Sequence, residues 1–194
     1  MSGSLSHIQR IFKDVELSKV ELELIASVMS RVEYNKGEII FKPGDIVNDL
    51  FHIETGCLRT FYIDNKGKEH TLQFGIKDWW ITDFTAFFTS SQAIMTLEVL
   101  EQAVLCKLSN SDREYLHENS PKFDTYIRRK LESSYAYFQK RIIADFSLSA
   151  KERYLNFIHT YSDIERKVKN YHIASYLGIT TESLSRIRKE ISSI

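Results

Sequence analysis

The sequence is poor in the residues that mark several protein classes. Its 194 residues include two cysteines, two prolines and seven glycines, and they contain no repeated low-complexity tract. Cys57 and Cys106 allow at most one disulfide and form no Cys-x-x-Cys pair, so we expect reduced thiols. No run approaches the roughly 20 apolar residues of a membrane span, and residues 1–7 lack the features of an export signal. These absences predict a cytoplasmic globular protein without a membrane partner.

The net charge of zero conceals an asymmetry between the two halves of the chain. Residues 1–110 carry 11 Lys and Arg against 15 Asp and Glu, whereas residues 111–194 carry 15 against 11. The basic half is therefore the C-terminal one. This excess favours a polyanionic partner there, although a solvated surface gives the same counts.

The front half reads as short β-forming runs separated by turns. Between residues 31 and 108, apolar runs alternate with glycine-containing turns, and residues 64–67 (Asp-Asn-Lys-Gly) form a hairpin signal. A helical period precedes these runs over residues 18–30. We expect a small antiparallel β-roll that follows one helix.

Past Ser109 the pattern becomes helical. Only Pro121 and Gly178 interrupt residues 110–194, and apolar residues recur every three or four positions, which predicts one long helix. The stripe comprises Phe123, Ile127, Leu131, Tyr135, Phe138, Ile142 and Phe146. It can pack against the chain's own β-domain or against the same helix of a second subunit, and we favour the homodimer.

Residues 171–190 have the pattern of a helix-turn-helix. Ala174 is small enough for two helices to cross, and Gly178 tolerates the positive φ of a sharp turn. Thr180 can cap the second helix, while Leu184 and Ile187 would face the first. In a helix-turn-helix the second helix enters the major groove of DNA. A tight corner between two core helices is the alternative.

The polar side chains of this motif are the candidate DNA contacts. Arg186 can bind guanine O6 and N7 bidentately, and Glu182 can accept from cytosine N4. Lys169, Arg188 and Lys189 suit phosphate, and a solvated surface charge is the alternative for each basic residue. The whole candidate interface is Lys169, Thr180, Thr181, Glu182, Ser183, Ser185, Arg186, Arg188 and Lys189.

A β-roll, a long helix and a helix-turn-helix, in that order, resemble the bacterial Crp/Fnr superfamily of transcription factors. Residues 36–40, 43–45, 51–56 and 66–69 look like its recurring β-roll pattern, and residues 181–186 (Thr-Glu-Ser-Leu-Ser-Arg) are similar to its Arg-Glu-Thr-x-x-Arg. The resemblance implies an α+β fold. Its parts would be a cyclic-nucleotide-binding-like jelly roll over residues 1–115, a dimerisation helix over 116–148 and a DNA-binding domain over 149–194. It also implies double-stranded DNA, a second copy of the chain and RNA polymerase as partners.

The chain departs from this family at several positions. Thr181 stands where the family has arginine, which changes the expected DNA sequence. The family's phosphate cassette, Gly-Glu followed by Arg-Ser/Thr-Ala, is missing, and no Lys or Arg lies between Asp78 and Cys106, so cyclic AMP is disfavoured. Four residues after Glu190 are too few for the family's C-terminal wing, and two cysteines do not match its iron–sulfur branch.

The stretch that replaces the phosphate cassette is rich in aromatic residues. Trp79, Trp80, Asp83, Phe84 and Met95 are the candidates for a pocket that binds an unidentified small-molecule effector. A core closed by its own side chains is the interpretation we favour for this stretch. No cofactor is expected.

A metal-dependent enzyme of the cupin type is the rival function, because cupins are also β-barrels. Only His52 and His70 lie in the β-region, and no hydrolase, phosphate-loop or zinc-protease motif occurs. We therefore expect neither a metal site nor catalysis. A third possibility is a dimeric effector-sensing module that does not bind DNA.

Overall fold

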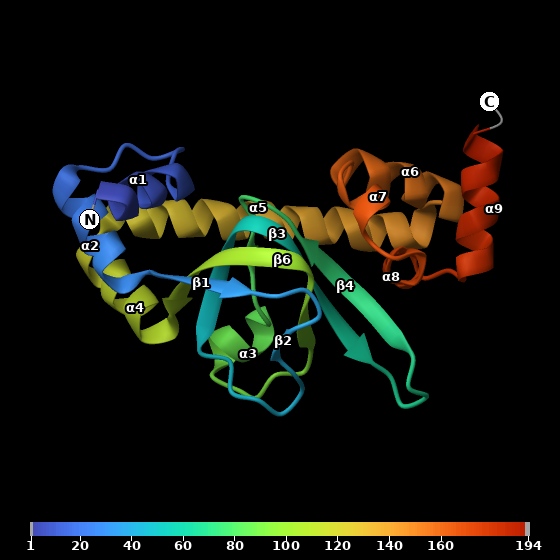
Figure 1. Cartoon of the computed structure of the whole chain (residues 1–194), viewed down its shortest axis with the longest axis horizontal. Coiled ribbons are helices and arrows are strands. Elements are labelled where there is room, and N and C mark those ends of the chain that lie inside the picture. The colour runs from blue at the N-terminus through green and yellow to red at the C-terminus, as the bar shows by residue number, and fades with distance from the viewer. Residues whose placement is uncertain (1, 193–194) are drawn as a thin grey trace.

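The protein is built around one long helix with a β-roll beside it and a helical group at each end (Figure 1). A computed structural model describes residues 2–192. Met1, Ser193 and Ile194 lie outside these residues. The expectation that the chain lacks a C-terminal wing concerns the four residues after Glu190, and two of those four are therefore not described.

The β-roll is antiparallel, as predicted, and follows two N-terminal helices. Its strands pair in the order β1-β6-β3-β4, with β2 on β6 and β5 on β3. The turn over residues 64–67 joins β3 to β4, as its sequence indicates. The elements are α1 (Ser2–Ile11), α2 (Lys19–Val28), β1 (Ser30–Tyr34), β2 (Ile39–Phe41), β3 (Asp49–Ile63), β4 (Glu69–Gly75), β5 (Trp80–Ile81), α3 (Phe84–Thr89) and β6 (Thr96–Ser109).

The central strands β3 and β6 are longer than the short apolar runs of the sequence. Gly56 lies within β3, not between two strands, and the β3–β6 register shifts on both sides of it. Its φ is 97°, and a Cβ at this position would lie 2.6 Å from the Gln102 carbonyl oxygen and 2.7 Å from Ala103. Glycine therefore lets the two strands approach closely at a bulge.

The second half of the chain is helical. Ser120 caps α5, with Pro121 in the first turn, and Ser149 and Glu152 form a capping box at the start of α6. Within residues 2–192, no helix is both long and apolar enough to cross a membrane. The elements are α4 (Asn110–Asn119), α5 (Pro121–Ser147), α6 (Ala150–Thr160), α7 (Ile164–Lys167), α8 (Asn170–Leu177) and α9 (Thr181–Ser192).

The first turns of α5 are covered by the chain's own N-terminal helices. Phe123 and Ile127 are buried in a cluster with residues of α1, α2 and α4, and the Phe12 and Phe123 ring centroids are 5.9 Å apart. Assigning Phe123 and Ile127 to a dimer interface is therefore wrong. The covering helix α1 had no recognised signal in the sequence.

The rest of the apolar stripe on α5 is open. Phe138 is partly exposed, and the exposed fractions of Leu131, Tyr135, Ile142 and Phe146 are 37%, 66%, 55% and 88%. Scattered exposed apolar residues are normal, but a continuous stripe on one helix indicates an interaction surface.

We predict that Gly56→Ala lowers the free energy of unfolding by about 2 kcal/mol or more, because the new Cβ would collide with the β6 backbone at a positive φ. Gly67→Ala is the matched control. Its φ is also positive, at 77°, but no atom lies within 4 Å of the added Cβ, so we expect a loss of only about 1 kcal/mol. Urea unfolding measures both, and equal losses would contradict the steric explanation.

Candidate nucleic-acid interface and the adjoining pocket

The helix-turn-helix forms as the sequence predicts. Gly178 ends α8 with φ 67°, and its N–H donates to the carbonyls of Ala174 and Ser175. The Thr180 hydroxyl accepts from the Ser183 N–H at 3.2 Å and caps α9. Leu184 and Ile187 are buried against the preceding helices, which fixes the face that α9 turns to solvent.

The outer face of α9 is polar and lies at the end of the molecule opposite α1 (Figure 1). Glu182, Ser185, Arg186 and Lys189 are exposed there. The backbone N–H of Glu182 and the hydroxyls of Thr180 and Thr181 lower the pKa of the Glu182 carboxyl, so it is ionised at neutral pH and accepts hydrogen bonds only.

Arg188 does not lie on this outer face. Its guanidinium is 2.8 Å from a Glu165 carboxylate oxygen and donates to the Tyr154 hydroxyl at 3.2 Å and to Asn170 Oδ1 at 2.5 Å. The structure therefore corrects the expectation that Arg188 contacts phosphate, since its donors brace α9 against α6, α7 and α8. Lys169, by contrast, is exposed just before α8.

The helix-turn-helix packs directly on the edge strand β4. The Thr71 N–H donates to Ser175 Oγ at 2.9 Å, and the Ser175 hydroxyl donates to the Glu69 carbonyl at 2.7 Å. Arg141 of α5 donates to the Leu72 carbonyl and, at 3.2 Å, to the Tyr176 carbonyl. Backbone groups of the sheet edge thus bind α8 and α5 in place of another strand.

Aromatic side chains fill the junction between the β-roll and the C-terminal helices. The Tyr137 hydroxyl lies 2.9 Å from that of Tyr176 and donates to that of Tyr161 at 3.3 Å. We call Tyr137, Tyr161 and Tyr176 the tyrosine cluster. The Phe74 ring packs on Tyr176 with centroids 5.4 Å apart, and Trp79 packs on Tyr161 at 5.5 Å. Burial raises the pKa of Tyr161 well above its usual value, so its hydroxyl keeps its proton.

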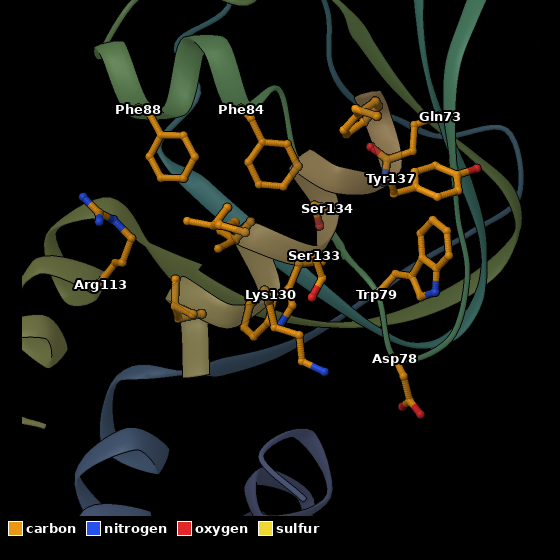
Figure 2. Close-up of a pocket in the computed structure, with 15 residues that line it drawn as sticks. Gln73, Asp78, Trp79, Phe84, Phe88, Arg113, Lys130, Ser133, Ser134 and Tyr137 are labelled. Atoms are coloured by element: carbon orange, nitrogen blue, oxygen red, sulfur yellow. The ribbon is translucent and has the colours of Figure 1, made fainter. Parts of the chain in front are cut away.

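A pocket of about 260 Å3 lies between the β-roll and α5. Figure 2 shows Phe84 and Phe88 on one side, across from Trp79 and Tyr137. The predicted residues Trp79, Trp80 and Phe84 therefore meet at one cavity. The lining comprises Leu50, Gln73, Asp78, Trp79, Trp80, Phe84, Phe88, Arg113, Ile127, Lys130, Leu131, Ser133, Ser134, Tyr137 and Phe138.

Two residues assigned to the pocket from the sequence do not line it. Asp83 is fully buried and caps α3, where its carboxylate accepts from the backbone N–H groups of Ala86, Ile94 and Met95 at 3.1, 2.9 and 3.2 Å. Met95 is also absent from the lining. A capping aspartate needs no ligand, because these three donors satisfy it.

Comparison with known proteins agrees with this architecture. The cyclic nucleotide-binding domain family matches residues 31–120. The chain is 25% identical to the anaerobic regulatory protein of Haemophilus influenzae, over 88% of this chain and 70% of that protein. It is 24% identical to the fumarate and nitrate reduction regulatory protein of Vibrio cholerae, over 88% and 72%. The chain is thus similar to regulatory proteins of this type over most of its length.

Solved structures show the same fold. FixK2 from Bradyrhizobium japonicum superposes with a TM-score of 0.74 at 15% identity, covering 86% of this chain and 85% of that one. A CooA mutant from Carboxydothermus hydrogenoformans gives 0.71 at 16% identity, covering 96% and 84%. Both similarities extend well beyond the β-roll.

The pocket is also lined by two cations that the sequence prediction did not include. Arg113 comes from α4 and lies over the Phe88 ring at 5.6 Å, while Lys130 comes from α5 and pairs with Asp14 at 3.1 Å. The cation-free stretch from Asp78 to Cys106 therefore does not leave the cavity without positive charge. Of the two cations, only Lys130 had a signal in the sequence, because the helical period places it off the apolar stripe of α5.

The cupin-type metal site proposed as a rival is ruled out by the strand register. His70 of β4 lies opposite Tyr62, ten residues along β3 from His52. Ten residues of strand, at about 3.3 Å per residue, separate the two positions along β3, and within residues 2–192 His52 and His70 belong to no common group of potential metal ligands.

We predict that His172→Asn removes part of the acid sensitivity of the fold. Burial, with smaller contributions from Arg59 and Lys169, lowers the pKa of His172 in α8 to about 3, against 6.5 for an ordinary histidine. The unfolded chain therefore binds a proton that the folded chain does not, and stability falls as the pH drops below 6.5. Between pH 7 and pH 5 the native chain should lose on the order of 2 kcal/mol more than the variant. Urea unfolding at both pH values tests this, and identical losses would contradict it.

Proposed function

We propose that this protein is a sequence-specific DNA-binding transcriptional regulator of the Crp/Fnr type that acts as a homodimer. The carrying observation is α9, whose apolar face is buried while Glu182 and Arg186 point outward at one end of the molecule. An α-helix with a polar outer face fits the major groove of B-form DNA.

The outward side chains have distinct proposed roles. Arg186 offers paired donors for guanine O6 and N7, and ionised Glu182 accepts from cytosine N4. Thr181 and Ser185 contact bases or phosphates, while Lys169 and Lys189 neutralise phosphate and hold the register. Thr180, which caps α9 by accepting from the Ser183 N–H, and Ser183 itself complete the interface at the first turn of the helix.

The open stripe on α5 supports the dimer. Pairing two copies along Leu131, Tyr135, Phe138, Ile142 and Phe146 would bury apolar surface that the single chain leaves in water. Two-fold symmetry would then place the two α9 helices about 34 Å apart, one turn of DNA, on a near-palindromic site.

The pocket supports control by a small molecule. We assign it to an apolar effector with a polar or anionic group, since the aromatic walls carry Gln73, Arg113 and Lys130 among them. Trp79 and Tyr137 line the pocket, Tyr137 belongs to the tyrosine cluster and Trp79 packs on it, so an occupant would touch the junction with the helix-turn-helix. The same proposal includes RNA polymerase as the partner of the DNA-bound dimer.

Selection of bound fragments from a random DNA pool, with and without small-molecule cell extract, tests the proposal. Enrichment of a near-palindromic site, with binding that weakens steeply as salt rises, is the expected result. Failure to enrich any sequence under either condition would favour the sensing module that does not bind DNA.

We predict that Arg186→Ala weakens binding to the selected site by about 1–3 kcal/mol and relaxes the preference at one base pair. Lys189→Ala is the comparison, and it should weaken binding to selected and random DNA alike. Gel shifts at fixed salt measure both. Equal losses of Arg186→Ala on selected and random DNA would contradict base reading by Arg186.

We predict that Ile142→Asp converts the dimer to a monomer at micromolar concentration, because a carboxylate would be buried in an apolar seam. Lys140→Asp is the matched control, since Lys140 is exposed on the same helix outside the stripe, and the dimer should persist. Sedimentation equilibrium measures the mass of each. A dimer of Ile142→Asp as tight as the native one would place the interface elsewhere.

A further inference from the structure

Three potential metal ligands from distant parts of the sequence meet on the side of the β-roll that α1 covers. His7 lies on α1, Glu54 on β3 and Cys106 on β6. The histidine nitrogen, a carboxylate oxygen and the Cys106 sulfur all lie within 4.8 Å of one another, and His7 Nε2 is 2.7 Å from Glu54 Oε1. The fold, and not sequence spacing, brings this cluster together.

The cluster is largely shielded from water and incompletely satisfied. Cys106 is 1% exposed, and the side chains of His7 and Glu54 are 12% and 14% exposed. His7 Nε2 and Glu54 Oε1 are both buried and lie 2.7 Å apart, at ion-pair distance, but without the angles of a hydrogen bond. Buried polar atoms normally have well-formed partners. A cation between these ligands would satisfy both atoms.

A second buried histidine lies beside the three ligands. His52 pairs with Cys106 across β3 and β6 and is 2% exposed. Its Nδ1 is buried and makes no hydrogen bond with any described residue. This ring is therefore available as a fourth ligand after a side-chain rotation, or as a neighbour that orients the site.

The donor set suits zinc. Zinc binds histidine nitrogen, cysteine sulfur and carboxylate oxygen at about 2.0–2.3 Å in tetrahedral geometry, so two ligands of one ion lie about 3.3–3.8 Å apart. Donors within 4.8 Å reach such an ion with small side-chain movements. One thiolate and one carboxylate also balance the charge of a divalent ion.

Two cations, Arg10 and Arg31, lie close enough to His7 to oppose further positive charge there. Arg31 Nε lies 3.4 Å from Glu54 Oε2, but the Arg31 side chain is more than half exposed and also pairs with Glu33 at 2.9 Å. The guanidinium can remain with Glu33 and leave the Glu54 carboxylate to an ion. The Arg31 side of this pair is exposed to solvent, which screens the interaction, so Arg31 can give way to an ion at Glu54.

We propose that His7, Glu54 and Cys106 form a binding site for a zinc-class divalent transition metal, with His52 or water as the fourth ligand. Such an ion would join α1 to the central strands of the sheet. The proposal stands on these residues alone and does not depend on DNA binding.

The position of α1 matters for the pocket. Phe12, in the turn after α1, packs on Tyr126 with ring centroids 4.5 Å apart, and the Tyr126 hydroxyl donates to the Ile11 carbonyl at 2.9 Å. The Trp80 ring nitrogen donates to the same hydroxyl at 3.4 Å, and Trp80 lines the pocket. An ion that fixes α1 would therefore also steady one wall of the effector site.

The test is a titration of the whole, metal-stripped protein with Co2+ under reducing conditions, followed by competition with Zn2+. We expect one equivalent of Co2+, the visible bands of tetrahedral cobalt, and a near-ultraviolet charge-transfer band from a thiolate ligand. Zn2+ should displace the cobalt. Absence of stoichiometric binding, or binding without the thiolate band, would overturn the proposal.

Variants identify the ligands. Cys106→Ser should remove the thiolate band, and His7→Gln should weaken Zn2+ binding at least about tenfold. Cys57→Ser is the matched control, because Cys57 is an equally buried cysteine of a different cluster, and it should bind as the native chain does. His7→Gln changes a residue on the covering helix, so it tests the site even where Cys106→Ser fails to fold. Loss of the band in Cys57→Ser with its retention in Cys106→Ser, or native affinity in His7→Gln, would contradict the assignment.

Discussion

The contact between the helix-turn-helix and the edge of the β-roll determines where α9 points. Three tyrosine hydroxyls meet in an apolar junction around Phe74, and Ser175 joins α8 to the backbone of β4. Buried hydroxyls must keep their partners, since each one left unsatisfied costs about 1–3 kcal/mol. Separation of the two parts would therefore break several interactions together, which favours two discrete arrangements over gradual drift.

The pocket and this junction share two side chains. Trp79 and Tyr137 line the cavity on one side and contact Tyr161 on the other. A ligand shifts such an equilibrium only through a difference in its affinity for the two arrangements. The shared residues supply a physical source for that difference, because an occupant that moves either ring also changes the packing that holds α8 in place.

Local sequence signals predicted the secondary-structure elements. The residues whose predicted roles differ from the structure are those that make contacts with distant parts of the chain. The turn at residues 64–67 and the left-handed backbone conformation of Gly178 are encoded within a few residues, so the hairpin and the helix-turn-helix could be predicted from the sequence. Phe123 lies on the predicted stripe, but an unanticipated helix covers it. Arg188 and Asp83 have charged side chains that suit the binding roles predicted for them. In the structure, Arg188 pairs with Glu165, and the Asp83 carboxylate accepts from the Ile94 N–H. The spacing of residues along the sequence does not predict these contacts.

The length of α5 gives it a mechanical property. The helix rises about 1.5 Å per residue, so Ser147, its last residue, is about 30 Å beyond Ile127 at the cavity wall. A tilt of about 6° at the cavity would then displace the far end by about 3 Å, close to the about 3.4 Å between stacked base pairs. Because α5 is this long, a rearrangement at the cavity that is smaller than one side chain would displace the far end of the helix by nearly the distance between two stacked base pairs.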